Sequence, residues 1–294
     1  MKKTMLLYVA LMLLFCANLS ADGELIALGP EPYPTGPVSF ETYTPEPGVV
    51  QPGEFAIYQF SWNGIPAARA WVEVRNDPER PDYICAGGEG NILGRVAALY
   101  QAEDSISSCM NATTFKPDQY SIRIRETLTH YDMVIKFDHE AGIADRQKKY
   151  RRKTTEKQFH YTNAFCPASV FLYVRSLPWR PGDKRRFEVI DGNERYLLVV
   201  EAKEIRKIKV PAGEFRAIRL EPSIFEMPRD HRRESASWWE RQKEKDKQRI
   251  KLISSFELWM ATEAPRPVIK MVADVFFGKV EMNLTEFTAP EPAI

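Results

Sequence analysis

The sequence predicts a mostly β protein, in which an antiparallel meander forms a partly open barrel or curved sheet with one packed helix. Three observations predict this fold class. Turn signals recur at intervals of about 8–12 residues, several segments alternate apolar and polar residues with a period of two, and one segment has a strong helical pattern. Strands and helices do not alternate along the chain, so a doubly wound parallel sheet is not expected.

The meander pattern is clearest over residues 183–222. Asp191 and Gly192 begin a hairpin turn signal between two apolar segments. A second turn is predicted between Pro211 and Gly213, because proline fixes its own φ and glycine can adopt a positive φ without strain. Consecutive short turns of this kind join antiparallel neighbours, so this stretch predicts several adjacent strands of one sheet.

The first residues have the pattern of a targeting segment. Two lysines precede an apolar run over residues 5–15, which is too short to span a bilayer. We predict a signal peptide over residues 1–21 with cleavage near Ala21, and therefore a periplasmic or secreted protein. The alternatives are an uncleaved anchor and a lipoprotein modified at Cys16. Phe15 is large for the position before a lipidated cysteine, which makes the lipoprotein the less favoured interpretation.

The mature chain is predicted to contain a single folded domain. Residues 22–52 are rich in proline, glycine and glutamate, which is typical of a flexible leader. The β domain is predicted over residues 53–288, with a strongly charged insertion over residues 227–251. A short tail covers residues 289–294.

The first half of the domain is predicted to be a run of strands. Asn63 and Gly64 form a hairpin signal between the first two strands, and the glycines from Gly87 to Gly90 are expected to end the third. Residues 91–99 could form a short helix. Strands are predicted over residues 54–62, 66–75, 83–86, 100–109, 120–125 and 131–137, with a basic surface hairpin over residues 146–157.

The second half begins with the best helix candidate, over residues 167–177. Pro167 suits the first helical position and Pro178 stops the helix. Closing strands are predicted over residues 253–260, 267–273 and 276–285. The total is about ten strands, a number consistent with a sandwich or barrel.

Composition limits the classes of partner. Lys and Arg total 41 against 40 for Asp and Glu, so the net charge does not indicate a nucleic-acid-binding protein. Two basic runs depart from this balance, over residues 146–153 and 229–251. In the second run, Trp238 and Trp239 could contact a membrane interface, and the alternative is a solvated helix or hairpin tip.

Three cysteines remain after the predicted signal peptide. Cys85 and Cys109 lie in neighbouring predicted strands, so an oxidising compartment favours a disulfide between them. The alternative is three buried free thiols. Cys166 opens the predicted helix, where the helix dipole could stabilise a thiolate, although a small buried residue is the favoured interpretation.

The sequence does not indicate a metal, a cofactor or a catalytic centre. The four histidines lack the paired spacing of metal ligands, and there is no G-x-S-x-G signature of a nucleophile elbow. The glycines between Gly88 and Gly94 do not match a dinucleotide-binding loop, and the required strand–helix context is missing. We therefore predict no catalytic residues.

Aromatic residues give the main functional clue. Tyr58, Phe60 and Trp62 share one face of the first predicted strand, and Trp259 lies on a late strand. In a curled sheet these side chains could face each other and line a cavity for a lipid, with Arg175 holding an acidic head group. The alternatives are ordinary core packing for the aromatics and a helix C-terminal charge for Arg175.

Four short motifs occur in order along the chain: the hairpin from Trp62 to Ala68, the helix residues Leu172, Tyr173 and Arg175, the turn from Val210 to Phe215, and Trp259 followed by Arg266, Pro267 and Val268. Together they resemble a large secreted bacterial family catalogued only as a domain of unknown function. The resemblance covers roughly residues 53–287 and implies an exported, mostly antiparallel β domain without an assigned activity. The sequence departs from the family pattern at Cys166, where an acidic residue often opens the helix, and in its longer charged insertion.

These observations favour a non-catalytic exported envelope protein. The leading hypothesis is that it binds an apolar or amphipathic ligand such as a lipid, or assists envelope assembly, with peripheral membrane contact as an additional expectation. A hydrolase-type periplasmic enzyme and a purely structural surface protein are the alternatives. Clustered titratable residues in a pocket would favour the enzyme, and a continuous apolar cavity would favour the ligand binder.

Overall fold

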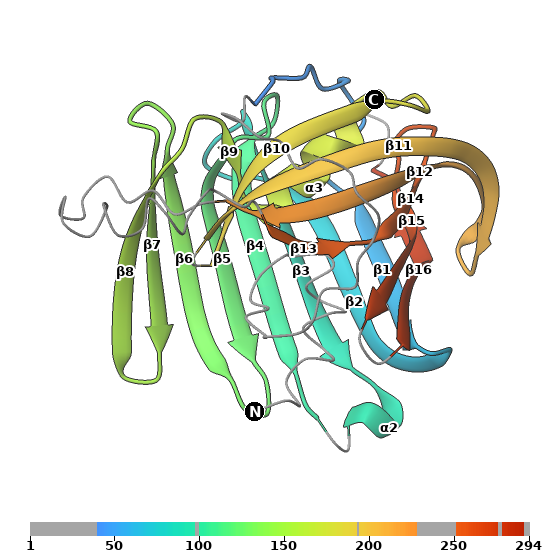
Figure 1. Cartoon of the computed structure of the whole chain (residues 1–294), viewed down its shortest axis with the longest axis horizontal. Coiled ribbons are helices and arrows are strands. Elements are labelled where there is room, and N and C mark those ends of the chain that lie inside the picture. The colour runs from blue at the N-terminus through green and yellow to red at the C-terminus, as the bar shows by residue number, and fades with distance from the viewer. Residues whose placement is uncertain (1–39, 98–99, 193, 228–250, 276–277, 291–294) are drawn as a thin grey trace.

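The fold is one large, strongly curved β-sheet that does not close into a barrel (Figure 1). The computed structural model describes residues 40–97, 100–192, 194–227, 251–275 and 278–290. The predicted signal peptide and nearly all of the charged insertion lie outside these residues. The predicted fold class is confirmed, although the sheet has sixteen strands and not the ten expected.

The strands from the first half of the chain form one wing of the sheet, shown in blue to green in Figure 1. Short turns join most of them, so consecutive strands are antiparallel neighbours. In chain order they are β1 (Phe55–Trp62), β2 (Ile65–Asn76), β3 (Tyr83–Ile92), β4 (Glu103–Asn111), β5 (Pro117–Arg125), β6 (His130–Asp138), β7 (Ile143–Tyr150) and β8 (Lys153–His160), with the one-turn helix α2 (Gly94–Ala97) between β3 and β4.

The second half contributes the other wing and the main helix. The elements are β9 (Ala164–Phe165), α3 (Pro167–Ser176), β10 (Lys184–Asp191), β11 (Glu194–Val210), β12 (Gly213–Glu226), β13 (Lys251–Ser255), β14 (Glu257–Ala261), β15 (Val268–Val275) and β16 (Gly278–Thr288). The long strand β12 pairs with both β14 and β13 on the same side. The strands that precede and follow the insertion in the chain therefore belong to the same sheet.

The strand order brings the two ends of the domain together. The sheet runs β8-β7-β6-β5-β4-β3-β2-β1-β16-β15-β14-β12-β11-β10-β9, so β1 and β16 pair as antiparallel neighbours. The edge strands are β8 and β9, and β9 is parallel to β10, which makes the sheet mixed. A sheet with this many strands has to curl, and α3 lies inside the curve (Figure 1).

The helix α3 begins where the sequence predicts. Cys166 is its N-cap: the Cys166 thiol accepts from the backbone N–H of Ser169, and the Ser169 hydroxyl accepts from the backbone N–H of Cys166. Pro167 follows in the first turn, where its missing N–H costs no hydrogen bond. Nearly every residue of the helix is buried, because the sheet wraps around it. Its sequence therefore shows no clear separation into a polar face and an apolar face.

One predicted strand end is wrong. The glycines from Gly87 to Gly90 do not end β3 but lie within it. A Cβ atom on Gly88 would lie 2.8 Å from the carbonyl oxygen of Trp71 on the neighbouring strand. Gly88 therefore permits a close approach of two backbones, which is the other common use of glycine in a strand.

The predicted flexible leader ends earlier than expected. From Tyr43 onward the chain packs against α3, although the sequence there has little periodicity. The backbone N–H of Tyr43 donates to the Tyr173 hydroxyl at 2.9 Å, and that of Glu46 donates to the carbonyl of Ser176 at 2.8 Å. Val49 is buried. Tertiary contacts with the helix, and not local propensity, order this segment.

The turn before β12 gives a first test of the fold. Gly213 has a φ of +139°, in a region that other residues rarely adopt, so Gly213→Val should lower the free energy of unfolding by about 1–2 kcal/mol. Thermal melts of both proteins measure this. Glu214→Val, one residue later at an exposed position of β12, is the control and should change the midpoint little. Equal midpoints for Gly213→Val and wild type would contradict the turn geometry.

Candidate ligand-binding site

The described residues line an apolar cavity between α3 and the second wing of the sheet. Its volume is about 70 Å³, which exceeds the space needed for one water molecule several times over. The cavity is almost entirely apolar. Its lining residues are Pro167, Val170, Phe171, Val174, Arg175, Val189, Tyr196, Leu198, Val200, Leu220, Pro222, Ile224, Phe256, Leu258, Met260, Val268 and Met271.

Alternation along the strands explains why these side chains converge. Leu198 and Val200 are two residues apart on β11, and Leu220, Pro222 and Ile224 are two apart on β12. Successive side chains of a strand point to opposite faces, so each set lies on one face. The pairing register aligns the two sets across the strands. The inner face of this wing is therefore a continuous apolar wall opposite α3.

Arg175 is the charged residue in this lining, and its guanidinium already has partners within the protein. Its Nη2 atom lies 2.7 Å from Oε2 of Glu54, and the two side chains are only 6% and 3% exposed. The same guanidinium donates to the carbonyl oxygens of Arg266 at 3.1 Å and Pro265 at 2.8 Å. The geometry therefore gives Arg175 a structural role, and its predicted role at an acidic head group has no support here.

Two of the predicted aromatic residues lie on the cavity side of the sheet but beyond the cavity itself. Tyr58 and Phe60 are buried in the core. Phe60 is in register with Met282, which is in register with the cavity residue Met271. Burial raises the pKa of Tyr58 to about 12. These residues pack as core, which was the alternative interpretation, and Trp62 at the end of β1 is half-buried.

The structure does not bring Trp259 to face these aromatics. Its neighbour Leu258 lines the cavity, so Trp259 points to the opposite face of β14. There it is in register with Arg219 and Lys270, and its indole N–H donates to Glu257 at 2.6 Å. Trp259 is buried in the same core cluster as Tyr58 and Phe60, so it packs as core and does not line the cavity. Trp238 and Trp239 lie outside the described residues.

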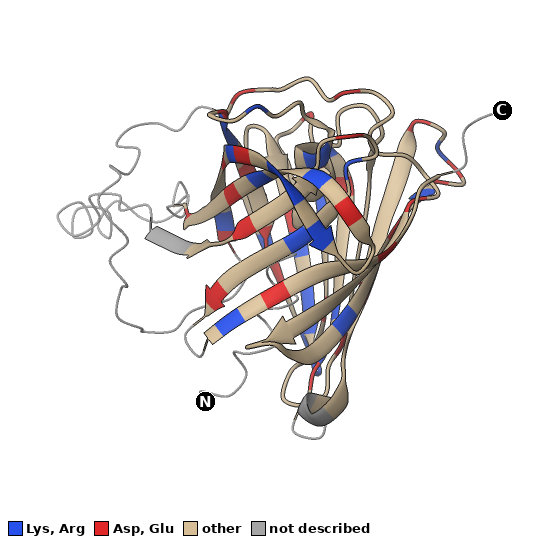
Figure 2. Ribbon diagram, turned by 90° about the vertical axis from the view of Figure 1, so that its right-hand side faces the viewer, with Lys and Arg blue, Asp and Glu red and all other residues tan. Residues whose placement is uncertain are grey.

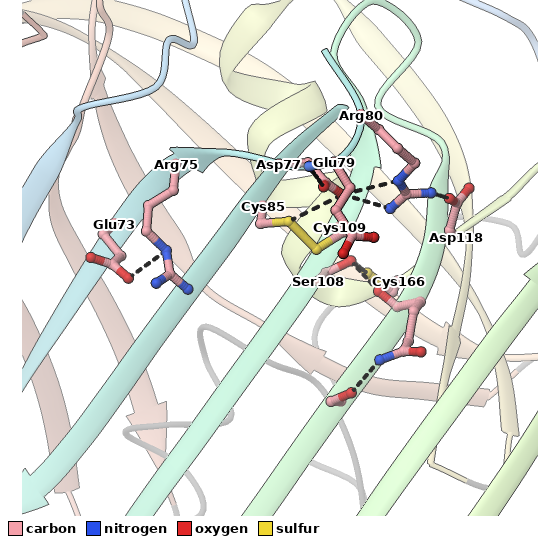
Figure 3. Close-up of a disulfide and its surroundings, with 12 residues drawn as sticks. Glu73, Arg75, Asp77, Glu79, Arg80, Cys85, Ser108, Cys109, Asp118 and Cys166 are labelled. Carbon is pink, nitrogen blue, oxygen red and sulfur yellow. Dashed lines mark hydrogen bonds and ion pairs between the residues drawn. A yellow bond between two sulfur atoms is a disulfide. The ribbon is translucent and has the colours of Figure 1, made fainter. Parts of the chain in front are cut away.

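A disulfide joins β3 to β4, between Cys85 and Cys109 (Figure 3). Cys85 and Cys109 lie directly opposite each other on the two paired strands, as expected from the sequence-based preference for this disulfide. Beside them, Arg80 pairs with Asp77 at 2.8 Å and also with Asp118. Asp77 and the two sulfurs are close together, but a disulfide leaves no thiolate to bind a metal ion.

Cys166 is not placed for nucleophilic chemistry. Its thiol is fully buried, contacts the Ser108 hydroxyl at 3.2 Å, and has a pKa raised by that burial (Figure 3). Both ring nitrogens of His139 already have hydrogen-bond partners within the protein: the carbonyl oxygen of Pro117 at 2.8 Å and the hydroxyl of Tyr161 at 3.0 Å. Neither residue lines the cavity.

Buried acidic groups lie away from the cavity. Burial raises the pKa of Asp104 to about 6 and those of Glu126 and Asp191 to about 7. Groups with such pKa values could act as general acids or bases if a substrate reached them. None of the three lines the cavity, and the described lining provides no second charged group besides Arg175. The cavity therefore has the character of a binding site for an apolar molecule.

The outer surface carries charges of both signs. On the side shown in Figure 2, Lys and Arg alternate with Asp and Glu along the strands. Many are paired across strands, for example Arg219 with Glu257 at 3.2 Å. None of the helices in the described ranges is long and apolar enough to cross a membrane.

The sequence model of one protein family matches residues 57–285, which is most of the chain. The protein belongs to the DUF3108 family. That family is described as proteins of unknown function, and its match confirms the resemblance noted from the motifs. A search of curated proteins finds no match.

One solved structure supports the fold of this DUF3108 protein. A β-barrel-like protein of the DUF1849 family from Brucella abortus has a TM-score of 0.53 at 7% identity, with 85% of this chain and 99% of that chain covered. A Bacteroides fragilis protein with a YmcC-like fold has a TM-score of 0.34 at 8% identity, with 84% of this chain and 100% of that chain covered. At these identities the similarity concerns the fold alone, and only the first score is high enough to support it.

Proposed function

We propose that this DUF3108 protein is an exported, non-catalytic binder of a slender apolar chain, such as the acyl chain of an envelope lipid. The cavity between α3 and strands β10, β11, β12, β14 and β15 is the observation that supports this proposal. Apolar surface left unfilled in a core is unfavourable unless something occupies it. An apolar cavity of about 70 Å³ suits an unbranched hydrocarbon chain better than a bulky ring system.

The charge arrangement defines which part of the ligand enters. Arg175 is neutralised by Glu54, so a second negative charge beside it would face the carboxylate as well. The apolar part of the ligand is therefore the part expected inside, with any head group at the opening. Nothing in the described lining offers an activated nucleophile or a general base, which favours a binder over the hydrolase alternative.

Export is the second part of the proposal. The predicted signal peptide and the disulfide both favour an oxidising compartment outside the cytoplasm. Mass spectrometry of the mature N-terminus should find a chain that begins just after Ala21. An intact Met1 or a lipid on Cys16 would contradict periplasmic release.

Filling the cavity should abolish binding. Val170 lies on α3 and lines the cavity, so Val170→Phe places a ring in the space that the chain would occupy. We expect saturable binding of a fluorescent fatty acid to wild type and a loss of at least about ten-fold in affinity in the variant. Native mass spectrometry of protein purified from the periplasm should show a bound lipid in wild type only.

Ile65→Phe is the matched control, because Ile65 is 57% exposed and is not among the lining residues. It adds a ring of the same kind without touching the cavity, and its affinity should equal that of wild type. Circular dichroism checks that both variants are folded. If wild type carries no lipid and binds no fatty acid, the purely structural role replaces the binding role.

A further inference from the structure

The inner face of the β7–β8 hairpin holds buried positive charge that no carboxylate of the described residues pairs with. Arg146 is only 6% exposed, yet it forms no ion pair within the part of the chain that the structure describes. Its Nη1 atom donates to the Thr155 hydroxyl at 3.3 Å, and its buried Nε atom has no hydrogen-bond partner. A buried guanidinium with one weak contact is unusual, because desolvation of a charge is costly.

Lys148 adds a second cation on the same face. It lies two residues from Arg146 on β7, so the two side chains point to the same side of the sheet. Its ammonium group lies 3.7 Å from the centre of the Tyr131 ring, and the residue is half-buried. Burial lowers the pKa of Lys148, and the nearby Arg146 lowers it further. The two cations therefore destabilise each other in the absence of an anion.

The surroundings of this pair also contain poorly satisfied polar groups. Asp191, at the end of β10, is close enough to Lys148 to favour its charged form. The Oδ1 atom of Asp191 and the hydroxyl of Tyr120 are both buried without a well-formed hydrogen bond, although Tyr120 is near enough to stabilise the ionised carboxylate. Burial raises the pKa of Asp191 to about 7, so near neutral pH its carboxyl only partly compensates the two cations.

This face lies at one edge of the sheet. The hairpin of β7 and β8 forms a free edge of the sheet, at the left of Figure 1. Thr155, opposite Lys148 on β8, is exposed. Lys148 is only half-buried, so its side chain meets solvent beside Thr155, whereas the apolar cavity lies on other strands.

We propose that the inner face of the β7–β8 hairpin binds a phosphate-type oxyanion between the Lys148 ammonium and the Arg146 guanidinium. A tetrahedral oxyanion offers several acceptor oxygens, so it can bridge two donors on one strand face, and charge-assisted hydrogen bonds of this kind are strong. The ligand is a soluble phosphate or the phosphodiester head group of a lipid. This site is separate from the apolar cavity.

The test titrates full-length mature protein with inorganic phosphate at low ionic strength, where screening is weak. Isothermal titration calorimetry should show saturable binding to wild type. Lys148→Gln should weaken it about ten-fold, as expected for the loss of one charge-assisted hydrogen bond. Lys149→Gln is the matched control: Lys149 is exposed on the opposite face of the same strand and should retain wild-type affinity.

A second variant separates binding from folding. Arg146→Met removes the buried charge, so without phosphate it should melt at or above the wild-type temperature, and added phosphate should no longer raise its midpoint. A lower midpoint than wild type in phosphate-free buffer would instead mean that Arg146 stabilises the fold, which overturns the proposal.

The source of the anion is decided by a parallel experiment with vesicles. Phosphatidylcholine vesicles with and without phosphatidylglycerol are sedimented with wild type and with Lys148→Gln. Sedimentation that depends on phosphatidylglycerol and on Lys148 assigns the site to a lipid head group. Binding of inorganic phosphate alone assigns it to a soluble anion. Binding of neither probe, or equal losses in Lys148→Gln and Lys149→Gln, rejects the site.

Discussion

Replacing Arg175 by methionine is expected to lower the free energy of unfolding by about 3–5 kcal/mol. The reason is that Arg175 and Glu54 form an ion pair at 2.7 Å with almost no solvent exposure. Removal of the guanidinium leaves a buried carboxylate whose remaining partner is the backbone N–H of Gln51, at 2.8 Å from Oε1. Urea denaturation followed by tryptophan fluorescence measures the loss.

Two companion variants make this prediction specific. Glu54→Gln combined with Arg175→Met removes both charges while keeping an acceptor for Gln51, so the double variant should be more stable than Arg175→Met alone. Arg69→Met breaks the exposed pair with Glu286, whose side chains are 53% and 64% exposed, and should change stability by less than about 1 kcal/mol. If Arg175→Met were as mild as Arg69→Met, the buried pair would not hold the helix to the segment just before β1.

Asp191→Asn is expected to make the protein relatively more stable at high pH than at low pH. Burial raises the pKa of Asp191 from 3.8 to about 7, while interactions with Tyr120, the Gly192 backbone and Lys148 act in the opposite direction. In the unfolded chain this carboxyl loses its proton near pH 4. Between about pH 4 and pH 7 the folded state therefore holds a proton that the unfolded state has lost.

The sign of the effect follows from that difference in bound protons. The stability that the protonated carboxyl provides is fully present below its unfolded pKa and is lost as the pH rises through about 7. The amide that replaces the carboxyl in the variant cannot ionise, so this loss disappears. The stability of Asp191→Asn relative to wild type should rise from pH 4 to pH 8 by on the order of 4 kcal/mol.

Denaturation curves at several pH values measure this difference directly. Asp104 and Glu126 have raised pKa values too and contribute to the wild-type profile in the same window, but they are unchanged in the variant. Asp82→Asn, at an exposed aspartate, is the control and should run parallel to wild type. Parallel curves for Asp191→Asn would mean that Asp191 is ionised in the fold from low pH onward.

Much of the local structure follows from the sequence alone. Proline at the first helical position and a terminating proline define α3 to within a residue, because both signals act on the backbone itself. The Asn63–Gly64 turn and the Gly213 turn join adjacent strands for the same reason, since a two-residue hairpin needs an unusual φ that few residues adopt. The preference for pairing Cys85 with Cys109 also follows, because the two cysteines lie in neighbouring strands, although the sequence leaves free thiols open as the alternative.

The candidate site depends on contacts that no local pattern encodes. Alternation shows that Tyr58, Phe60 and Trp62 share a face, but it does not say which face turns inward. That choice is made by pairing between distant segments, as in the contact of Arg175 with Glu54, which are 121 positions apart. The same long-range pairing places the cavity against α3 and buries Arg146, although its sequence context is a basic surface run. Sequence therefore determines the elements and their turns, whereas the register of a strongly curved sixteen-stranded sheet decides which residues meet.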